Sequence, residues 1–223
     1  NILELVVSSF NTKEVIITND IVIERTQQNI VRYDKNGDMH YDIISAFIKS
    51  IRGSDPNAAV YWLARMLEGG EDVKFIARRL LILSSEDIGN ANPTALVMAN
   101  NCFQAVNVIG YPECRIILSQ TVIYLSCSEK SNSSYKAINI AQKEVKNSGN
   151  LSVPIHLRNA KSKLMEELDY GKDYVYSHEN PNMEQEFLPK EIKNTTFYNP
   201  LDNNKENTFK KTLKKIWKGK YNY

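Results

Sequence analysis

The sequence predicts an all-α protein, and three observations support this prediction. Apolar residues recur at three- and four-residue spacing along most of the chain, as they do on one face of a helix. Asp55-Pro56 and Asn92-Pro93 each place a capping side chain before a proline at the first helical position, where a missing N–H costs nothing. Glycines suited to helix ends follow at positions 69, 70, 89 and 110.

The expected elements follow in order. Two short helices, 2–10 and 20–30, flank a β-branched piece at 14–18, and a polar stretch at 33–38 marks a boundary. The later helices are expected at 39–52, 56–68, 71–84, 93–109, 112–127, 135–147, 161–168 and 208–218. Short connections among the four helices between residues 56 and 127 predict that successive helices there are antiparallel. Between the helices at 161–168 and 208–218, the aromatic-rich run 168–204 predicts an extended strap anchored on the helices by its tyrosines and phenylalanines.

The composition is typical of a soluble globular protein, with 42% hydrophobic and 24% charged residues. No apolar run approaches the roughly 20 residues that span a bilayer. No basic-then-apolar leader opens the sequence, so neither a membrane nor export is expected. The chain starts at Asn1 rather than at methionine, inside an apolar-periodic run, and we expect it to be a piece of a longer protein.

The cysteines and histidines do not predict a metal site. Cysteine is odd in number and lacks CxxC spacing, so Cys102, Cys114 and Cys127 are expected to be buried apolar side chains in a reducing cytosol. The three histidines, at 40, 156 and 178, are scattered.

The charge is concentrated at one end. The stretch 205–223 has seven lysines and one glutamate, a balance of +6, which leaves −4 for residues 1–204. Such a basic segment with interleaved aromatic residues suits single-stranded nucleic acid, although basic tails also occur as plain solvated surface. The candidate DNA-binding residues are Lys210, Lys211, Lys214, Lys215, Trp217 and Lys218.

Two helices suggest subunit contact. The helix expected from Pro112 to Cys127 is apolar almost all round, so it needs either a central place in the domain or a partner chain. The preceding helix carries a row of carboxamides that can be solvated or can hydrogen-bond across an interface. The candidate interface residues are Asn100, Gln104, Asn107, Ile116, Ile117 and Ile123.

Signals for catalysis are weak. The sequence contains no glycine-rich phosphate loop, nucleophile elbow or HExxH motif. Glu86 and Asp87 form an adjacent acidic pair that either serves chemistry or caps a turn and pairs with a nearby arginine. His156 and Arg158 either bind phosphate or hold the strap on backbone carbonyls. A small enzyme that used all four residues would need them in one pocket.

Several long strings, read together, resemble a known family. They are SSEDIGNANPTAL at 84–96, the runs 109–137 and 154–179, QEFLPKEI at 185–192 and TFYNP at 196–200. In this order they resemble the C-terminal half of the replication-associated recombination protein A family. These are bacterial AAA+ ATPases related to clamp loaders and to the eukaryotic Werner-helicase-interacting protein.

This resemblance implies more than the residues show. Members form tetramers through a C-terminal helical domain similar to the clamp-loader collar, hydrolyse ATP in a DNA-dependent way, and act at stalled replication forks with single-strand-binding protein as a partner. Their ATP and Mg²⁺ sites lie in the N-terminal half, so no catalytic residue, cofactor or metal is expected in this chain. A cytoplasmic, nucleoid-associated protein is implied.

The expected organisation combines both sources. Residues 1–33 would be a remnant of the AAA+ lid, 37–175 a collar that forms the tetramer, and 176–223 the strap and basic C-terminal helix. We expect a tetramer-forming region without an active site of its own. The alternative is a stand-alone helical module that binds single-stranded DNA through its basic tail.

Overall fold

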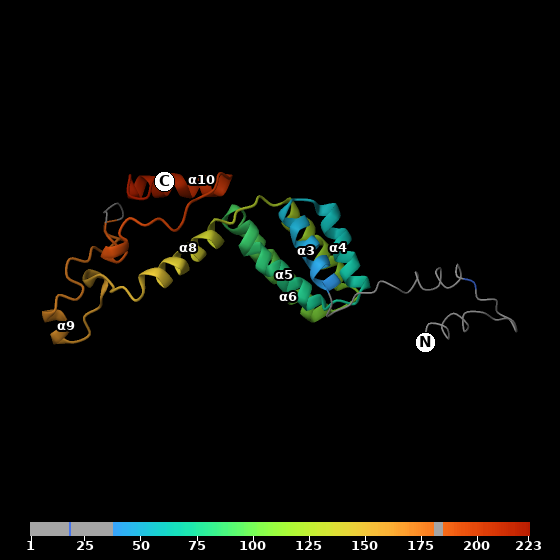
Figure 1. Ribbon diagram of the computed structural model, residues 1–223, viewed down its shortest axis with the longest axis horizontal. Coiled ribbons are helices and arrows are strands. Elements are labelled where there is room, and N and C mark those ends of the chain that lie inside the picture. The colour runs from blue at the N-terminus through green and yellow to red at the C-terminus, as the bar shows by residue number, and fades with distance from the viewer. Residues whose placement is uncertain (1–17, 19–37, 181–184) are drawn as a thin grey trace. The chain divides into compact units, whose positions relative to one another are not determined.

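The computed structural model describes residues 18, 38–180 and 185–223, and over these residues the protein is helical (Figure 1). Eight α-helices and no strand occur there, which confirms the all-α prediction. The expected elements at 2–10, 14–18 and 20–30, the boundary at 33–38 and the lid remnant at 1–33 lie outside the described residues. The helices are α3 (Asp38–Arg52), α4 (Pro56–Glu68), α5 (Val73–Leu83), α6 (Thr94–Ile109), α7 (Cys114–Cys127), α8 (Ser133–Ser148), α9 (Lys163–Glu167) and α10 (Asn204–Trp217).

The described helices fall into two compact units, one made of residues 38–79 and 102–126 and the other of 80–101, 127–180 and 185–223. In the first unit α3 packs against α4. Helix α4 starts as predicted: Asp55 accepts a hydrogen bond from Ala58 N at 3.0 Å, and Pro56 occupies the first turn. The largest fully buried side chains of this unit are Phe47, Ile51, Met66, Ile76, Val106, Leu118, Val122 and Leu125.

In the second unit, segment 84–92, which belongs to the string SSEDIGNANPTAL, packs against α8 and α10. Helix α5 passes into a π-helical turn, η1 (Ser84–Ile88), and then a 3₁₀ turn, η2 (Gly89–Ala91), which lie against α8. Gly89 has a φ of 48°, and a Cβ there would lie 2.9 Å from the Ser131 carbonyl oxygen. Only glycine therefore suits this approach. The Ser131 N–H in turn donates to the Asp87 carbonyl at 2.8 Å.

Two asparagine side chains join this segment to the first turn of α8 and to the loop before that helix. Asn90 Nδ2 donates to Ser134 Oγ, and Asn92 Nδ2 donates to Ser128 Oγ, both at 3.1 Å. Asn92, which was expected to cap the helix that follows Pro93, uses its side chain for a long-range hydrogen bond. Its side chain joins two parts of the second unit that are 36 residues apart.

Three expectations about boundaries and burial need correction. Pro112 does not open a helix, because residues 111–113 form a turn with a cis Tyr111-Pro112 bond and α7 starts at Cys114. The last helix begins at Asn204 rather than Thr208, because Asn203 accepts a hydrogen bond from Glu206 N and caps it. Cys127 is exposed at the end of α7, whereas the other two cysteines are buried as predicted.

The described residues between α8 and α10, 149–180 and 185–203, contain little regular structure, and the name strap is used below for this stretch, which starts earlier than the predicted run 168–204. It holds the 3₁₀ turns η3 (Ile155–Leu157) and η4 (Lys190–Ile192) and the short helix α9. At its end the buried carboxylate of Glu206 is the common acceptor for Ser131 Oγ (2.6 Å), Ser133 Oγ, Tyr198 OH (3.0 Å) and Asn203 Nδ2 (2.7 Å). We call these five residues the Glu206 cluster.

The ionisation of the Glu206 cluster follows from its geometry. Burial raises the pKa of Glu206, but hydrogen bonds from Ser131, Ser133 and Asn203 outweigh burial, so its pKa lies below its ordinary value of 4.5. Burial and the neighbouring carboxylate raise the pKa of Tyr198 to about 12. The cluster is thus a charged acceptor surrounded by neutral donors near neutral pH.

Glu206→Gln should lower the free energy of unfolding by about 2 kcal/mol at pH 7, because the amide leaves buried donors without a charged acceptor. Because the pKa of Glu206 is lowered in the folded protein, the free energy of unfolding should also depend on pH. Stability contributed by the charged form is complete above about pH 4.5 and is lost as pH falls through the lower folded pKa. Denaturant unfolding from pH 3 to 7 should show this dependence in the parent and less of it in the variant. Glu191→Gln, on the exposed surface, is the matched control; equal losses for both variants would contradict the prediction.

Candidate functional site

Helix α7 carries the first candidate interface. One side is buried through Cys114, Leu118, Val122 and Leu125. Ile116 and Ile123, which are seven residues apart and so share a face, are 63% and 45% exposed. The helix is therefore covered by its own unit on one side and bare on the other.

Further exposed apolar side chains occur at the end of α6 and in the turn that follows it. Val108 is 85% exposed, and Ile109 and Tyr111 are exposed as well. These side chains immediately precede α7 in the same unit. We refer to Val108, Ile109, Tyr111, Ile116 and Ile123 as the α6–α7 face. Large apolar side chains that are exposed close together in a chain are candidates for contact with a partner.

The remaining predicted interface residues differ in accessibility. Asn100, Gln104 and Asn107 are exposed on α6, and Asn107 Nδ2 donates to the Phe103 carbonyl at 3.0 Å. Ile117 is half-buried and so less accessible to a partner than Ile116.

Helix α10 presents the second candidate surface. Its predicted DNA-binding lysines, at 210, 211, 214, 215 and 218, are all exposed. Trp217 is different, because its half-buried ring lies 6.1 Å from the Phe187 ring and 5.4 Å from the Tyr221 ring, measured between centroids. The tryptophan thus also anchors the end of α10 on the strap.

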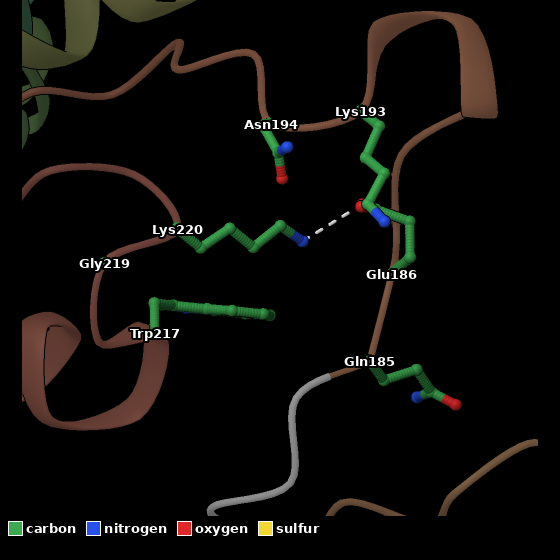
Figure 2. Close-up of a pocket in the computed structure, with 7 residues that line it drawn as sticks. All are labelled: Gln185, Glu186, Lys193, Asn194, Trp217, Gly219 and Lys220. Carbon is green, nitrogen blue, oxygen red and sulfur yellow. Dashed lines mark hydrogen bonds and ion pairs between the residues drawn. The ribbon is translucent and has the colours of Figure 1, made fainter.

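A polar cavity of about 470 Å³ lies beside Trp217 (Figure 2). Its other side chains come from the strap and from the residues after α10, and they include Glu186, Lys193, Asn194 and Lys220. Gln185 also lines the cavity, but its amide is engaged with the backbone of Val175. Sequence reasoning missed this site, since contacts between residues tens of positions apart in an irregular segment leave no local pattern.

Lys220 fills part of this cavity. Its Nζ lies 3.1 Å from Glu186 Oε1, 4.7 Å from the Trp217 ring centroid and 4.8 Å from that of Tyr221. Burial raises the pKa of Glu186, but the Leu188 N–H and Lys220 outweigh burial, and the net pKa is lowered. Among the described residues, the buried Glu186 Oε2 has no hydrogen-bond partner.

The four residues considered for catalysis serve other roles or lie apart. Glu86 lines an apolar groove with Leu81 and Tyr135, whereas His156 and Arg158 line a different cavity. Glu86 and Asp87 lie in the π-helical turn η1, where the Asp87 carbonyl binds Ser131 N–H. The arrangement gives no support to one catalytic pocket.

His156 and Arg158 hold the strap together, which was the simpler of the two interpretations. His156 Nε2 lies 2.8 Å from the Glu186 carbonyl oxygen. Arg158 Nε donates to the Val153 carbonyl at 2.7 Å, and its guanidinium lies over the Tyr170 ring. Within the described stretches, no group of three or more His, Cys, Asp or Glu side chains is placed to hold a metal ion, and no helix is long and apolar enough to cross a membrane.

Comparison with protein families agrees with this architecture. Residues 53–217 match the family model described as MgsA AAA+ ATPase C terminal, and residues 1–52 match one described as AAA C-terminal domain. The chain belongs to the MgsA AAA+ ATPase C-terminal family. The MgsA match runs from before α4 to the last residue of α10, so Lys220 lies beyond it.

Relatives of this MgsA C-terminal chain carry related names. Replication-associated recombination protein A of Coxiella burnetii is 40% identical over 219 residues, which is 96% of this chain and 50% of that protein. The protein of the same name from Bacillus subtilis is 43% identical over 226 residues, 99% of this chain and 53% of that protein. ATPase WRNIP1 of Dictyostelium discoideum is 40% identical over 189 residues, 83% of this chain and 22% of that protein. The resemblance found in the sequence is confirmed, and the chain spans about half the length of the bacterial relatives.

Arg158→Lys tests the structural role of this arginine in the MgsA C-terminal strap. Lysine lacks the planar guanidinium that binds Val153 and covers Tyr170, so the free energy of unfolding should fall by about 1 kcal/mol. Thermal unfolding and the rate of proteolysis within the strap measure the effect. Lys163→Ala, an exposed position on nearby α9, should change neither quantity. A parent-like result for Arg158→Lys would contradict the role.

Proposed function

We propose that this chain is the assembly region of a DNA-dependent AAA+ ATPase that acts in replication and recombination, and that it holds four copies of the protein together. The α6–α7 face carries the proposal. Its five apolar side chains are exposed, which is unfavourable in water and favourable against a second copy. A permanent tetramer would bury more than about 2,000 Å² in such contacts.

The family membership supports the ATPase part of the proposal. We assign ATP, Mg²⁺ and contact with single-strand-binding protein to the full-length protein. In this scheme the chain would keep the ATPase modules in a fixed relation, so that DNA binding and nucleotide state are coupled between subunits.

The chain should sediment as a tetramer at micromolar concentration, and Ile116→Glu or Ile123→Glu should dissociate it. Each change would place a charge in an apolar contact and should raise the dissociation constant at least 100-fold, about 2.7 kcal/mol. Analytical ultracentrifugation measures the mass. Val145→Glu, at an exposed apolar position on α8, is the control and should leave the tetramer intact. A parent chain that stays monomeric at tens of micromolar contradicts the proposal, and unchanged masses for both variants place the contact elsewhere.

A second role, single-stranded DNA binding, is favoured by the exposed lysines at the end of α10. Five of them lie between positions 210 and 218, and a polyanion bound there would release counterions. This role is compatible with assembly, since the α6–α7 face belongs to the other compact unit.

Replacing Lys210 and Lys214 by glutamine should weaken binding of a thymidine 20-mer and reduce the slope of log K against log salt by about 1.4. Each lysine that neutralises a phosphate of a single strand accounts for about 0.7 of this slope. Fluorescence anisotropy at 50 to 200 mM salt measures the affinity and the slope. Replacement of Lys49 and Lys74, exposed lysines of the other unit, is the control. Parent-like affinity and slope for the Lys210 and Lys214 variant would exclude α10 as the DNA-binding surface.

A further inference from the structure

Glu186, which lines the cavity beside Trp217, has an unused acceptor. Lys220 and Leu188 N–H both bind Oε1 of Glu186, whereas the buried Oε2 has no hydrogen-bond partner among the described residues. A buried carboxylate oxygen without a donor is costly in a folded protein. Such an atom points to a donor that arrives from outside.

The cavity also contains an aromatic face covered by a movable group. In Figure 2 the side chain of Lys220 runs along the Trp217 ring on the side of the cavity. Lys220 lies beyond the last residue of α10, and its long side chain has four rotatable bonds. Removal of this side chain from the ring would expose a flat apolar surface next to a carboxylate.

The surrounding charges distinguish between possible ligands. Lys193 and Lys220 outnumber Glu186 in the cavity, and Lys214 lies three residues before Trp217, on the same side of α10. A cationic ligand, such as an arginine of a partner protein, would meet this excess of positive charge. A ligand that combines a flat ring, N–H donors and phosphate would suit every group present.

We infer that the cavity receives one unstacked base of single-stranded nucleic acid, preferably guanine, and that the ammonium of Lys220 occupies the place of that base in the free protein. The base would stack on Trp217. Guanine offers two adjacent donors, N1–H and the 2-amino group, to the two oxygens of Glu186. Lys193 and Lys214 would attract the flanking phosphates. The inference rests on the proposed DNA-binding role of α10 and adds a base-specific subsite to it.

The test uses Trp217 as its own reporter. The chain has two tryptophans, and Trp62→Phe leaves Trp217 as the single one. The probes are 12-nucleotide DNAs of abasic residues with guanine, hypoxanthine or no base at the centre, so that all carry the same phosphates. We expect guanine to quench Trp217 fluorescence and to bind at least about fivefold more tightly than the fully abasic strand, the lower end for one stacked base. Hypoxanthine, which lacks the 2-amino group, should bind more weakly than guanine.

Three variants separate the base subsite from general electrostatic attraction. Lys220→Ala should increase the guanine-to-abasic ratio, because it removes the group that occupies the stacking position. Lys215→Ala, on the exposed surface of α10, should weaken both strands equally. Glu186→Gln should abolish the preference for guanine over hypoxanthine. A decrease in affinity of equal size for both strands in Lys220→Ala would overturn the inference, because Lys220 would then be an ordinary phosphate-binding residue.

The remaining outcomes distinguish this inference from the proposed function. Equal binding of guanine and abasic strands without quenching overturns the base subsite and leaves DNA binding by α10 intact. Absence of binding by every strand at 50 mM salt overturns both. Quenching of Trp217 by an arginine-containing peptide but by no strand overturns the inference in favour of a protein partner.

Discussion

The buried carboxylate of Glu206 is the interaction on which the second unit depends. It accepts hydrogen bonds from residues before α8, from the end of the strap and from the cap of α10, so three segments distant in sequence meet at one charged group. A buried charge is tolerated only when such donors surround it. The position of α10, and with it of the basic surface, follows from this cluster.

The segment 84–92 reaches the same region from the other side. Gly89 allows close approach to Ser131, and Ser131 donates to Glu206. The string SSEDIGNANPTAL, which carries part of the family resemblance, therefore has a structural role, because its polar residues form hydrogen bonds with residues 128–134. Its acidic pair suggested chemistry because sequence does not show which polar groups are already engaged.

The two candidate surfaces follow different physical rules. The α6–α7 face consists of apolar side chains that their own unit leaves exposed, and it suits a permanent partner of the same kind. The surface of α10 consists of lysines and one aromatic cavity, and it suits a charged ligand that binds and leaves with changes in salt. The two proposed roles, subunit assembly and DNA binding, therefore place no conflicting demands on one surface.

The sequence by itself determined the helical class, most helix positions and the family. These properties depend on local periodicity, capping pairs such as Asp55-Pro56, and strings long enough to be unmistakable. The exposed face of α7 was partly predictable as well, because a helix that is apolar on all sides needs either a central place in its domain or a partner chain. Only the tertiary structure showed which side of α7 its own unit covers. It also showed that Glu206 is the central acceptor of its cluster and that Glu186 and Lys220 form an ion pair in the cavity beside Trp217. Glu206 meets Ser131, 75 residues away, and Glu186 meets Lys220, 34 residues away, and no sequence spacing predicts such pairs.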